Sequence, residues 1–256
     1  MNHTYPVYTI EAECQDCYKC VRHCPVKAIR VRDGHAAVLP ELCVACGKCV
    51  EVCPVKAKQV RNDTGRLKRL LAEPAPVYAS LAPSWVSEFK NVTPGQLIRA
   101  LKLLGFAGVS ETALGAQLVS AQVAGELDGG KPGLLLSSAC PTAVDYIRKY
   151  IPRLASNITP VGSPLMAHCR LLRDTFGNDI RVVFVGPCIS KKNEADRNPA
   201  LLNLAITYPE LKQLLRENKI EPERLTPEED DRFIPETAEE GAQYPVEGGM
   251  NDTLRD

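Results

Sequence analysis

The chain has 256 residues, 31 basic and 31 acidic side chains, and a net charge of zero at pH 7. A neutral chain gives no electrostatic reason to expect a nucleic-acid or anionic-membrane partner, and this length suggests one or two domains. No apolar stretch is long enough to span a bilayer, and residues 1–10 lack the basic start and apolar core of a signal peptide. We therefore expect a cytoplasmic protein, in which the 11 cysteines bind metal rather than form disulfides.

Two runs of four cysteines dominate residues 1–62. Both have the spacing Cys-x-x-Cys-x-x-Cys-x-x-x-Cys-Pro, which matches the run of bacterial two-cluster ferredoxins. In those proteins the fourth cysteine of each run ligates the other cluster. By this resemblance we expect two [4Fe–4S] clusters. The first would be held by Cys14, Cys17, Cys20 and Cys53, and the second by Cys43, Cys46, Cys49 and Cys24.

The two runs form an internal repeat. Cys20-Val-Arg-His-Cys24-Pro-Val-Lys-Ala in the first run matches Cys49-Val-Glu-Val-Cys53-Pro-Val-Lys-Ala in the second, so one structural unit is used twice. A zinc site and a disulfide framework are the alternatives. Zinc sites usually separate two Cys-x-x-Cys pairs, and disulfides are rare in a protein without a secretory signal. The pattern therefore favours iron–sulfur clusters.

Short strands and tight turns are expected around the two clusters. We predict four strands, at residues 7–13, 28–32, 35–39 and 57–62. Asp33-Gly34 is a hairpin signal between the second and third strands, and the fourth strand would pair with the first. Residues 1–62 would form a small α+β module in which the clusters replace much of a hydrophobic core, and residues 63–76 would form a linker.

From residue 77 onward, predicted strands alternate with predicted helices. Thr93-Pro94 supplies an N-cap and a proline at the first helical position, and Gly105 ends that helix. Apolar runs predict strands at residues 77–81, 107–112, 134–136, 181–185 and 204–207. Helical spacing predicts further helices at residues 114–127, 142–150, 163–176 and 209–217. The alternation predicts an α/β domain with parallel sheets and crossover helices at residues 77–218, followed by an acidic irregular segment at residues 219–256.

A second group of candidate residues follows the predicted strands of this domain. Cys140 follows the strand at residues 134–136, Cys188 follows the strand at residues 181–185, and Pro83 and Ser84 end another. In open α/β folds, ligands bind beyond the carboxyl ends of the strands, so these residues are expected to face one crevice. The alternative is that the two cysteines are buried structural thiols.

Two motifs in this region resemble signatures of the [FeFe]-hydrogenases. Ser138-Ala139-Cys140-Pro141 is similar to the first signature, Thr-Ser-Cys-Cys-Pro-x-Trp. The stretch Pro-Cys-Ile-Ser-Lys-Lys-Asn-Glu at residues 187–194 is similar to the second, Met-Pro-Cys-x-x-Lys-x-x-Glu. A double ferredoxin module also precedes these signatures in the family, so the resemblance covers nearly the whole chain.

The resemblance implies roles for six residues. Cys140 and Cys188 would each bind the four-iron part of a catalytic-type cluster. Lys191 would approach a cyanide ligand of a di-iron subsite, and Glu194 would serve a proton path. Pro83 and Ser84 would line the same cavity.

The sequence also departs from the family pattern. Ala139 stands where the family has a proton-relaying cysteine, Ala143 where it has tryptophan, and Gly186 where it has methionine. No cysteine follows Cys188, so the family's third, cysteine-rich signature is missing from this sequence. A third [4Fe–4S] cluster or a di-iron site is therefore expected only in a longer form, and Cys169 is read as a buried structural thiol. The pattern resembles most the sensory branch of the family.

These observations predict an iron–sulfur electron-transfer protein of hydrogenase-like architecture that senses redox state or hydrogen rather than turning hydrogen over quickly. A redox partner protein and a downstream sensor or output domain would be its partners. The alternatives are a fragment of a catalytic [FeFe]-hydrogenase and an iron–sulfur assembly factor of the hydrogenase-like type.

Overall fold

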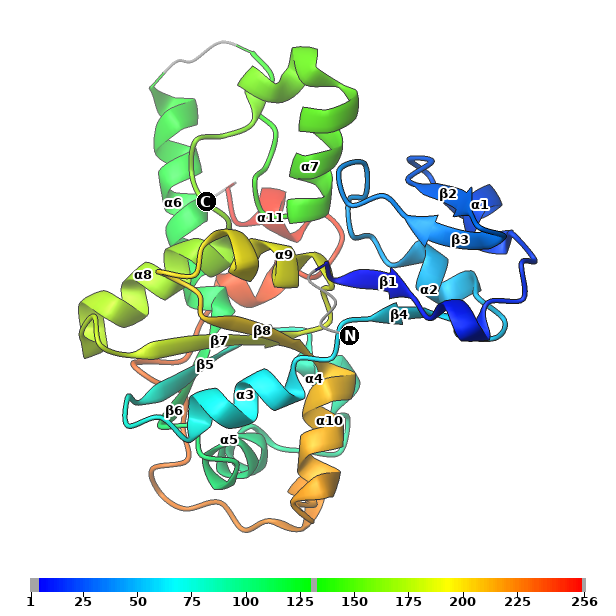
Figure 1. Ribbon diagram of the computed structural model, residues 1–256. Helices are drawn as coiled ribbons and strands as arrows, with labels where there is room; N and C mark the ends of the chain where they lie inside the picture. Colours follow the sequence, from blue (N-terminus) through cyan, green and yellow to red (C-terminus); the bar gives the residue numbers. More distant parts are fainter. Residues whose placement is uncertain (1–4, 130–132, 255–256) are drawn as a thin grey trace.

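The structure, a computed structural model, describes residues 5–129 and 133–254. A small cysteine-rich module stands beside a layered α/β domain (Figure 1). In the module, β1 (Val7–Thr9) pairs antiparallel with β4 (Lys58–Val60), and β2 (Ile29–Arg32) pairs antiparallel with β3 (His35–Val38). Helices α1 (Lys19–His23) and α2 (Lys48–Val52) each contain the third cysteine of their run, Cys20 and Cys49. The predicted pairing of the first and last strands is confirmed.

The hairpin between β2 and β3 follows from its turn residues. Asp33 and Gly34 both have positive φ, at 49° and 85°, which is the backbone of the tight turn that an Asp-Gly pair favours. The first strand is shorter than its sequence predicts. The prediction placed a strand at residues 7–13, but the chain bends into a 3-10 turn, η1 (Glu11–Glu13), immediately before the first cysteine.

The α/β domain is built on a four-stranded parallel sheet with strand order β6-β5-β7-β8. The strands are β5 (Val77–Leu81), β6 (Gly108–Glu111), β7 (Arg181–Gly186) and β8 (Leu204–Thr207). Nearly every residue in them is buried, as expected for a sheet covered on both faces. The predicted fold class, an α+β dicluster module followed by a parallel α/β domain, is confirmed.

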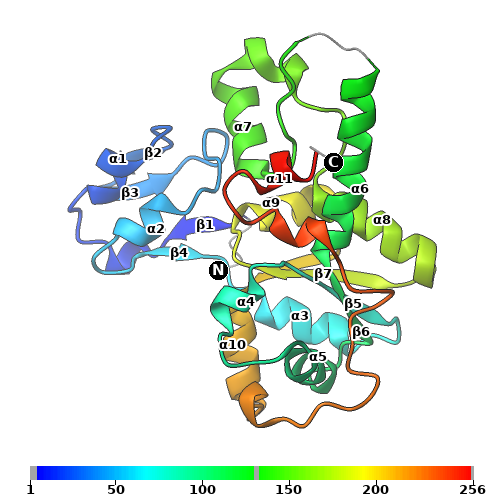
Figure 2. The same ribbon diagram turned by 180° about the vertical axis from the view of Figure 1, so that it is seen from behind.

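Helices cover both faces of this sheet (Figures 1 and 2). One face carries α3 (Thr64–Leu71), α5 (Pro94–Leu103) and α10 (Tyr208–Glu217). The other carries α6 (Thr112–Asp128), α8 (Pro164–Phe176) and α9 (Ser190–Arg197). The remaining elements are α4 (Trp85–Glu88), α7 (Pro141–Tyr150), η2 (Pro152–Asn157), η3 (Pro222–Arg224), η4 (Glu240–Gln243) and α11 (Gly249–Asp252).

The start of α5 shows how the sequence fixes one of these helices. The Thr93 hydroxyl accepts a hydrogen bond from the Gln96 backbone N–H, and the Gln96 side chain accepts one from the Thr93 backbone N–H. This reciprocal capping box satisfies two donors that the first turn would otherwise leave free. Leu97, Ile98 and Leu101 then face the core.

One predicted strand is wrong. Residues 134–136 do not join the sheet: Leu136 forms only an isolated parallel bridge with Ile158, and Leu134 is 55% exposed. The three consecutive leucines satisfy a strand pattern, but no strand of the described residues lies alongside them. Cys140 therefore does not follow a strand of the central sheet.

The segment after α10 runs back along the domain. The Ile234 backbone N–H donates to the Val109 carbonyl (3.0 Å), the Ala238 N–H donates to the Glu111 carboxylate (2.8 Å), and Phe233 is buried. Among the described residues, no helix combines the length and the apolar character needed to cross a membrane.

Candidate functional site

The two cysteine loops have matching backbone conformations. Asp16 and Tyr18 in the first run, and Ala45 and Gly47 in the second, lie between successive cysteines and have positive φ values of 51°, 53°, 52° and 82°. Each left-handed residue turns the chain sharply, so that cysteines with two residues between them can face the same point. Such a conformation is unfavourable for residues other than glycine and persists where the surrounding structure, such as a ligand clamp, holds it.

A small cavity marks the second predicted cluster. It is lined by Cys43, Cys46 and Cys49 of the second run and by Cys24, the fourth cysteine of the first run. The crossed assignment requires this set. In the other set, burial raises the pKa of the Cys20 thiol, and the nearby Cys53 and Cys14 raise it further, so these three cysteines lie close together. This arrangement is the one that the crossed pairing predicts, and the pairing itself stays a prediction.

The donor chemistry of these cavities suits iron–sulfur clusters. The Ala28 backbone N–H donates to Cys24 Sγ (3.2 Å) and the Ala45 N–H to Cys43 Sγ (3.4 Å), as expected for sulfurs that carry negative charge. Burial, together with the neighbouring Cys43, raises the pKa of Cys49 to about 12. Several thiolates at this depth would repel one another, and iron ions would supply the positive charge that lets them coexist. The described cysteines are all free of disulfides.

The carboxyl ends of β5 and β7 lie side by side in the α/β domain. Ala82 N–H donates to the Val185 carbonyl (2.9 Å), which places Pro83 and Ser84 beside the turn that carries Cys188. The Ser84 hydroxyl bonds to the Tyr208 hydroxyl (3.0 Å). Pro83, Ser84 and Cys188 thus lie at one edge of the sheet, as the sequence predicts for these three residues.

Gly186 occupies a tightly packed position at the same edge. A Cβ atom there would lie 2.8 Å from the Ala82 Cβ and closer still to the ring of Phe184. The chain therefore has no room for a methionine-sized side chain at this position unless its neighbours move.

Lys191 and Glu194 form a compact polar group with Ser163. Lys191 Nζ lies 2.7 Å from Glu194 Oε2 and donates to Ser163 Oγ (3.3 Å), and the Ser163 hydroxyl donates to Glu194 Oε1 (2.6 Å). Their side chains are only 10% and 12% exposed. The helical spacing of three residues on α9 brings the first two together. Ser163 also caps α8 by accepting from the Met166 N–H, and sequence reasoning did not assign it to the site.

Cys140 lies at the start of α7 and is exposed, whereas Cys188 is half-buried and its sulfur lies 3.0 Å from the Ser190 hydroxyl. Helices α7 and α9 are joined by an ion pair between Asp145 and Arg197 (2.8 Å). A cavity of about 330 Å³ lies between them and α8. Its lining includes Ser138, Pro141, Ser163, Met166 and Glu194. Glu194 thus shares this cavity with the residues on either side of the segment that carries Cys140. Neither Cys140 nor Cys188 lines the cavity.

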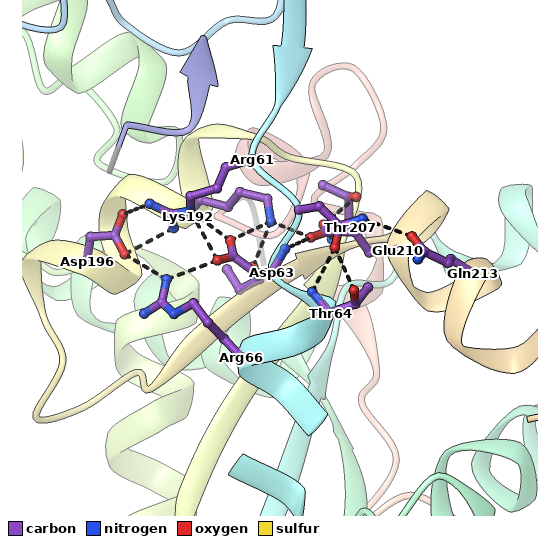
Figure 3. Close-up of polar contacts among 11 residues, drawn as sticks. Arg61, Asp63, Thr64, Arg66, Lys192, Asp196, Thr207, Glu210 and Gln213 are labelled. Carbon is purple, nitrogen blue, oxygen red and sulfur yellow. Dashed lines mark hydrogen bonds and ion pairs between the residues drawn. The ribbon is translucent and has the colours of Figure 1, made fainter. Parts of the chain in front are cut away.

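An ion-pair network that sequence reasoning missed lies behind α9 (Figure 3). Lys192 is fully buried and pairs with Asp63 (2.8 Å) and Glu210 (2.9 Å). Arg61, which follows β4, pairs with both Asp63 and Asp196. The partners of Lys192 lie 129 and 18 residues away in the chain, so no local pattern could reveal them. The network joins the end of the cysteine module to α9 and α10.

His168 belongs to the core rather than to a ligand set. Its Nδ1 bonds to Ser80 Oγ and its Nε2 to Ser110 Oγ, both at 2.8 Å, and the side chain is fully buried. Burial lowers the pKa of His168 to about 3. Its neighbour Cys169 is also fully buried, and burial raises the pKa of that thiol to about 12. Both residues sit on the face of α8 that covers the sheet.

The buried His168 leads to a prediction about acid stability. Below pH 6.5 the unfolded chain gains a proton on this histidine while the folded chain does not, until the pH approaches about 3. Stability should therefore fall with decreasing pH in this window, with a slope of up to about 1.4 kcal/mol per pH unit from this group. His168→Gln can still hydrogen-bond to the two serines. It should flatten the pH dependence of the protection factors for amide hydrogen exchange in β5 and β6. An unchanged slope would contradict this role.

Comparison with known proteins gives two family matches. Residues 75–255 match the family described as "Iron only hydrogenase large subunit, C-terminal domain". Residues 6–54 match the family described as "4Fe-4S dicluster domain". The second match confirms the prediction of two [4Fe–4S] clusters, and together the two matches confirm the predicted resemblance.

Curated relatives and solved structures agree with these matches. The chain is 29% identical over 202 residues to iron hydrogenase 1 of Clostridium pasteurianum, covering 72% of this chain and 35% of that protein. It is 29% identical over 274 residues to the periplasmic [Fe] hydrogenase large subunit of Nitratidesulfovibrio vulgaris, covering 94% and 64%. It is also 34% identical over 108 residues to a cytosolic Fe-S cluster assembly factor NAR1 homolog of Schizosaccharomyces japonicus, covering 37% and 21%.

The likeness to solved structures is one of fold. A structure of the [FeFe]-hydrogenase HydA1 from Chlamydomonas reinhardtii has a TM-score of 0.62 and 23% identity, covering 75% of this chain and 57% of that chain. The present sequence thus spans little more than a third of the clostridial relative and less than two thirds of the other proteins just named.

Proposed function

Because the chain belongs to the iron-only hydrogenase large-subunit family and carries a 4Fe-4S dicluster domain, we propose that it transfers single electrons between its two clusters and its α/β domain. When bound, each cluster supplies one-electron oxidation and reduction. We place its role in redox or hydrogen sensing rather than in fast hydrogen turnover. A redox partner protein would exchange electrons with the cysteine module, and an output domain in a longer form would respond.

The observation that carries this proposal is how α7 and Ile189, the residue before α9, hold the second cysteine loop. Lys149 Nζ donates to the Cys43 carbonyl (2.7 Å), Thr142 Oγ1 to the Val44 carbonyl (3.0 Å), and the Tyr150 hydroxyl to the Leu42 carbonyl (2.7 Å). All three donors lie on α7, the helix that Cys140 precedes.

Ile189, the residue immediately before α9, completes the contact. Its Cδ1 would lie 2.8 Å from a Cβ atom at Gly47, so the side chain packs directly on the second loop. Ile189 immediately follows Cys188. The second cysteine loop therefore lies against the segments that carry both candidate cysteines of the α/β domain, which supports electron exchange between the two parts.

Three features favour slow or no hydrogen turnover. Ala139 has no exchangeable proton where the family signature has a cysteine, and a positioned acid–base group typically contributes ~10²–10⁴-fold to proton transfer. Gly186 is packed too tightly for a longer side chain. Lys191 and Glu194 are already engaged with Ser163 and with each other.

The test is anaerobic reconstitution followed by metal analysis and a reduced-dye hydrogen assay. We expect about eight irons per chain, as two four-iron clusters require, two reducible paramagnetic signals and no rapid hydrogen evolution. Iron near twelve per chain with fast hydrogen evolution would instead favour the fragment of a catalytic hydrogenase.

The match to the assembly-factor homolog favours a second candidate function, iron–sulfur cluster delivery. The two functions predict different fates for the clusters. An electron-transfer protein retains its iron when mixed with an apo acceptor such as an apo-ferredoxin, whereas a delivery protein loses iron to it. Anaerobic gel filtration of the mixture, with iron measured in each fraction, distinguishes them.

A further inference from the structure

Two lysines are among the largest fully buried side chains of the described chain, and their surroundings differ sharply. Lys192 is paired with two carboxylates, Asp63 and Glu210. Lys58, in β4, is 2% exposed, and its Nζ donates to the Thr9 hydroxyl and to the Ala36 carbonyl. Both of these acceptors are neutral, and Lys58 forms no ion pair within the part of the chain that the structure describes. A buried ammonium without a counter-charge is costly.

Negative charge of another kind lies close to Lys58. Strand β4, which carries Lys58, packs against α2, which contains Cys49. The positive charge of Lys58 accordingly opposes the rise in pKa that burial causes at the Cys20 and Cys49 thiols. Cys20 belongs to the first predicted set of ligands and Cys49 to the second. A [4Fe–4S] cluster held by four thiolates has a net negative charge, and one added electron makes it more negative.

The internal repeat shows that the fold does not require a lysine here. The runs are offset by 29 residues, as Cys14 and Cys43 show, and the same offset relates Lys58 to Ile29 in β2. Ile29 is likewise buried, at 6% exposed. The first repeat therefore fills this position with an apolar side chain, and only the second places a charge there.

We propose that Lys58 is a shared counter-charge for both clusters, which raises the reduction potential of each by stabilising its reduced form. The inference rests on the two clusters of the proposed function. Because the ammonium is buried, salt screens its effect weakly, unlike that of surface charges. In a medium of low effective dielectric constant, one charge can act on two sites at once.

The test compares Lys58→Gln with Lys58→Arg in the full chain. Glutamine can still donate to the Ala36 carbonyl but has no charge, whereas arginine keeps the charge. In potentiometric titrations followed by paramagnetic resonance, Lys58→Gln should lower the reduced-to-oxidised ratio of both clusters about tenfold at a fixed potential, a shift of about 59 mV for a one-electron couple. Lys58→Arg should remain near the wild-type protein. Lys56→Gln is the matched control, because Lys56 is exposed on the same segment and should change little.

Each outcome decides the proposal. Unchanged potentials in a Lys58→Gln protein that holds both clusters would overturn it, as would failure of both Lys58 variants to bind iron, which would indicate a packing role. Loss of clusters in Lys58→Gln with retention in Lys58→Arg would support it, because the clusters would then be kept by the variant that keeps the positive charge. Thr9→Val removes one acceptor and leaves the charge, so potentials shifted as in Lys58→Gln would also overturn it. Absence of iron from the wild-type protein would refute the clusters themselves, and hence the proposed function.

Discussion

Replacement of Lys192 by methionine is expected to lower the free energy of unfolding by about 3–5 kcal/mol, the cost of breaking a buried ion pair from one side. The change leaves the carboxylates of Asp63 and Glu210 buried without their shared cation. Burial alone would raise the pKa of Asp63, but Lys192 and Arg61 outweigh it and hold that pKa below its ordinary value. The midpoint of chemical denaturation, followed by circular dichroism, measures the loss.

Two comparisons separate this effect from the loss of any surface charge. Lys68 pairs with Glu217 on the surface, with side chains 54% and 39% exposed, so Lys68→Met should cost less than about 1 kcal/mol. Adding Asp63→Asn to Lys192→Met removes one carboxylate that has lost its cation. The double variant should lose less free energy of unfolding than the sum of the losses of the two single variants. Equal denaturation midpoints for Lys192→Met and Lys68→Met would show that the ion-pair network contributes little to the stability of the fold.

The network also bears on function through α9. Lys192 and Asp196 pair with Asp63 and Arg61 at the end of the cysteine module. Lys191 and Glu194 instead contact Ser163, and Glu194 lines the cavity. One short helix is thus held to the end of the cysteine module by Lys192 and Asp196 (Figure 3). The same helix also carries Lys191 and Glu194 of the candidate polar group. Loosening Lys192 should therefore also disturb the seat of the second cysteine loop on Ile189.

The fold could be predicted largely because its signals are local. Asp33-Gly34 specifies a turn through the backbone of those two residues, and Thr93-Pro94 specifies a helix start through a cap that lies within four residues. Apolar runs bounded by glycine or proline likewise predicted the four strands of the sheet. Residues 134–136 were misread because a run of leucines satisfies a strand pattern whether or not a neighbouring strand exists. Only the bridge between Leu136 and Ile158 forms there.

The site was predictable only where its residues share one motif. The spacing of Lys191 and Glu194 on one helix brings them together without knowledge of the fold. Their partner Ser163 lies 28 residues upstream of Lys191 and contributes through the cap of another helix. Lys58 did leave a sequence signal, since the repeat pairs it with Ile29, but a lysine in an alternating strand normally faces solvent. Its burial depends on β3 covering β1, which a strand pattern does not show.

Removal of Cys53 is expected to destroy the first cluster rather than the second, although Cys53 lies in the second run. The cavity formed by Cys43, Cys46 and Cys49 is completed by Cys24, which leaves Cys53 for the other set. Either Cys53→Ala or Cys24→Ala alone should lower the iron content from about eight to about four per chain, because one four-iron cluster loses a ligand. Single variants therefore cannot reveal the pairing, and pairs of substitutions are needed.

The decisive comparison sets Cys14→Ala/Cys53→Ala against Cys43→Ala/Cys53→Ala. If Cys14 and Cys53 hold the same cluster, the first double variant loses nothing beyond either single change and keeps about four irons, whereas the second loses both clusters. Cys24 supplies the mirror-image control: with Cys43→Ala it should spare one cluster, and with Cys14→Ala it should spare none. Iron analysis and paramagnetic resonance of the reduced proteins give the count and the cluster type. The reverse pattern, in which Cys53→Ala spares a cluster only when combined with Cys43→Ala, would contradict the crossed assignment. It would show that each run holds its own cluster with its own fourth cysteine.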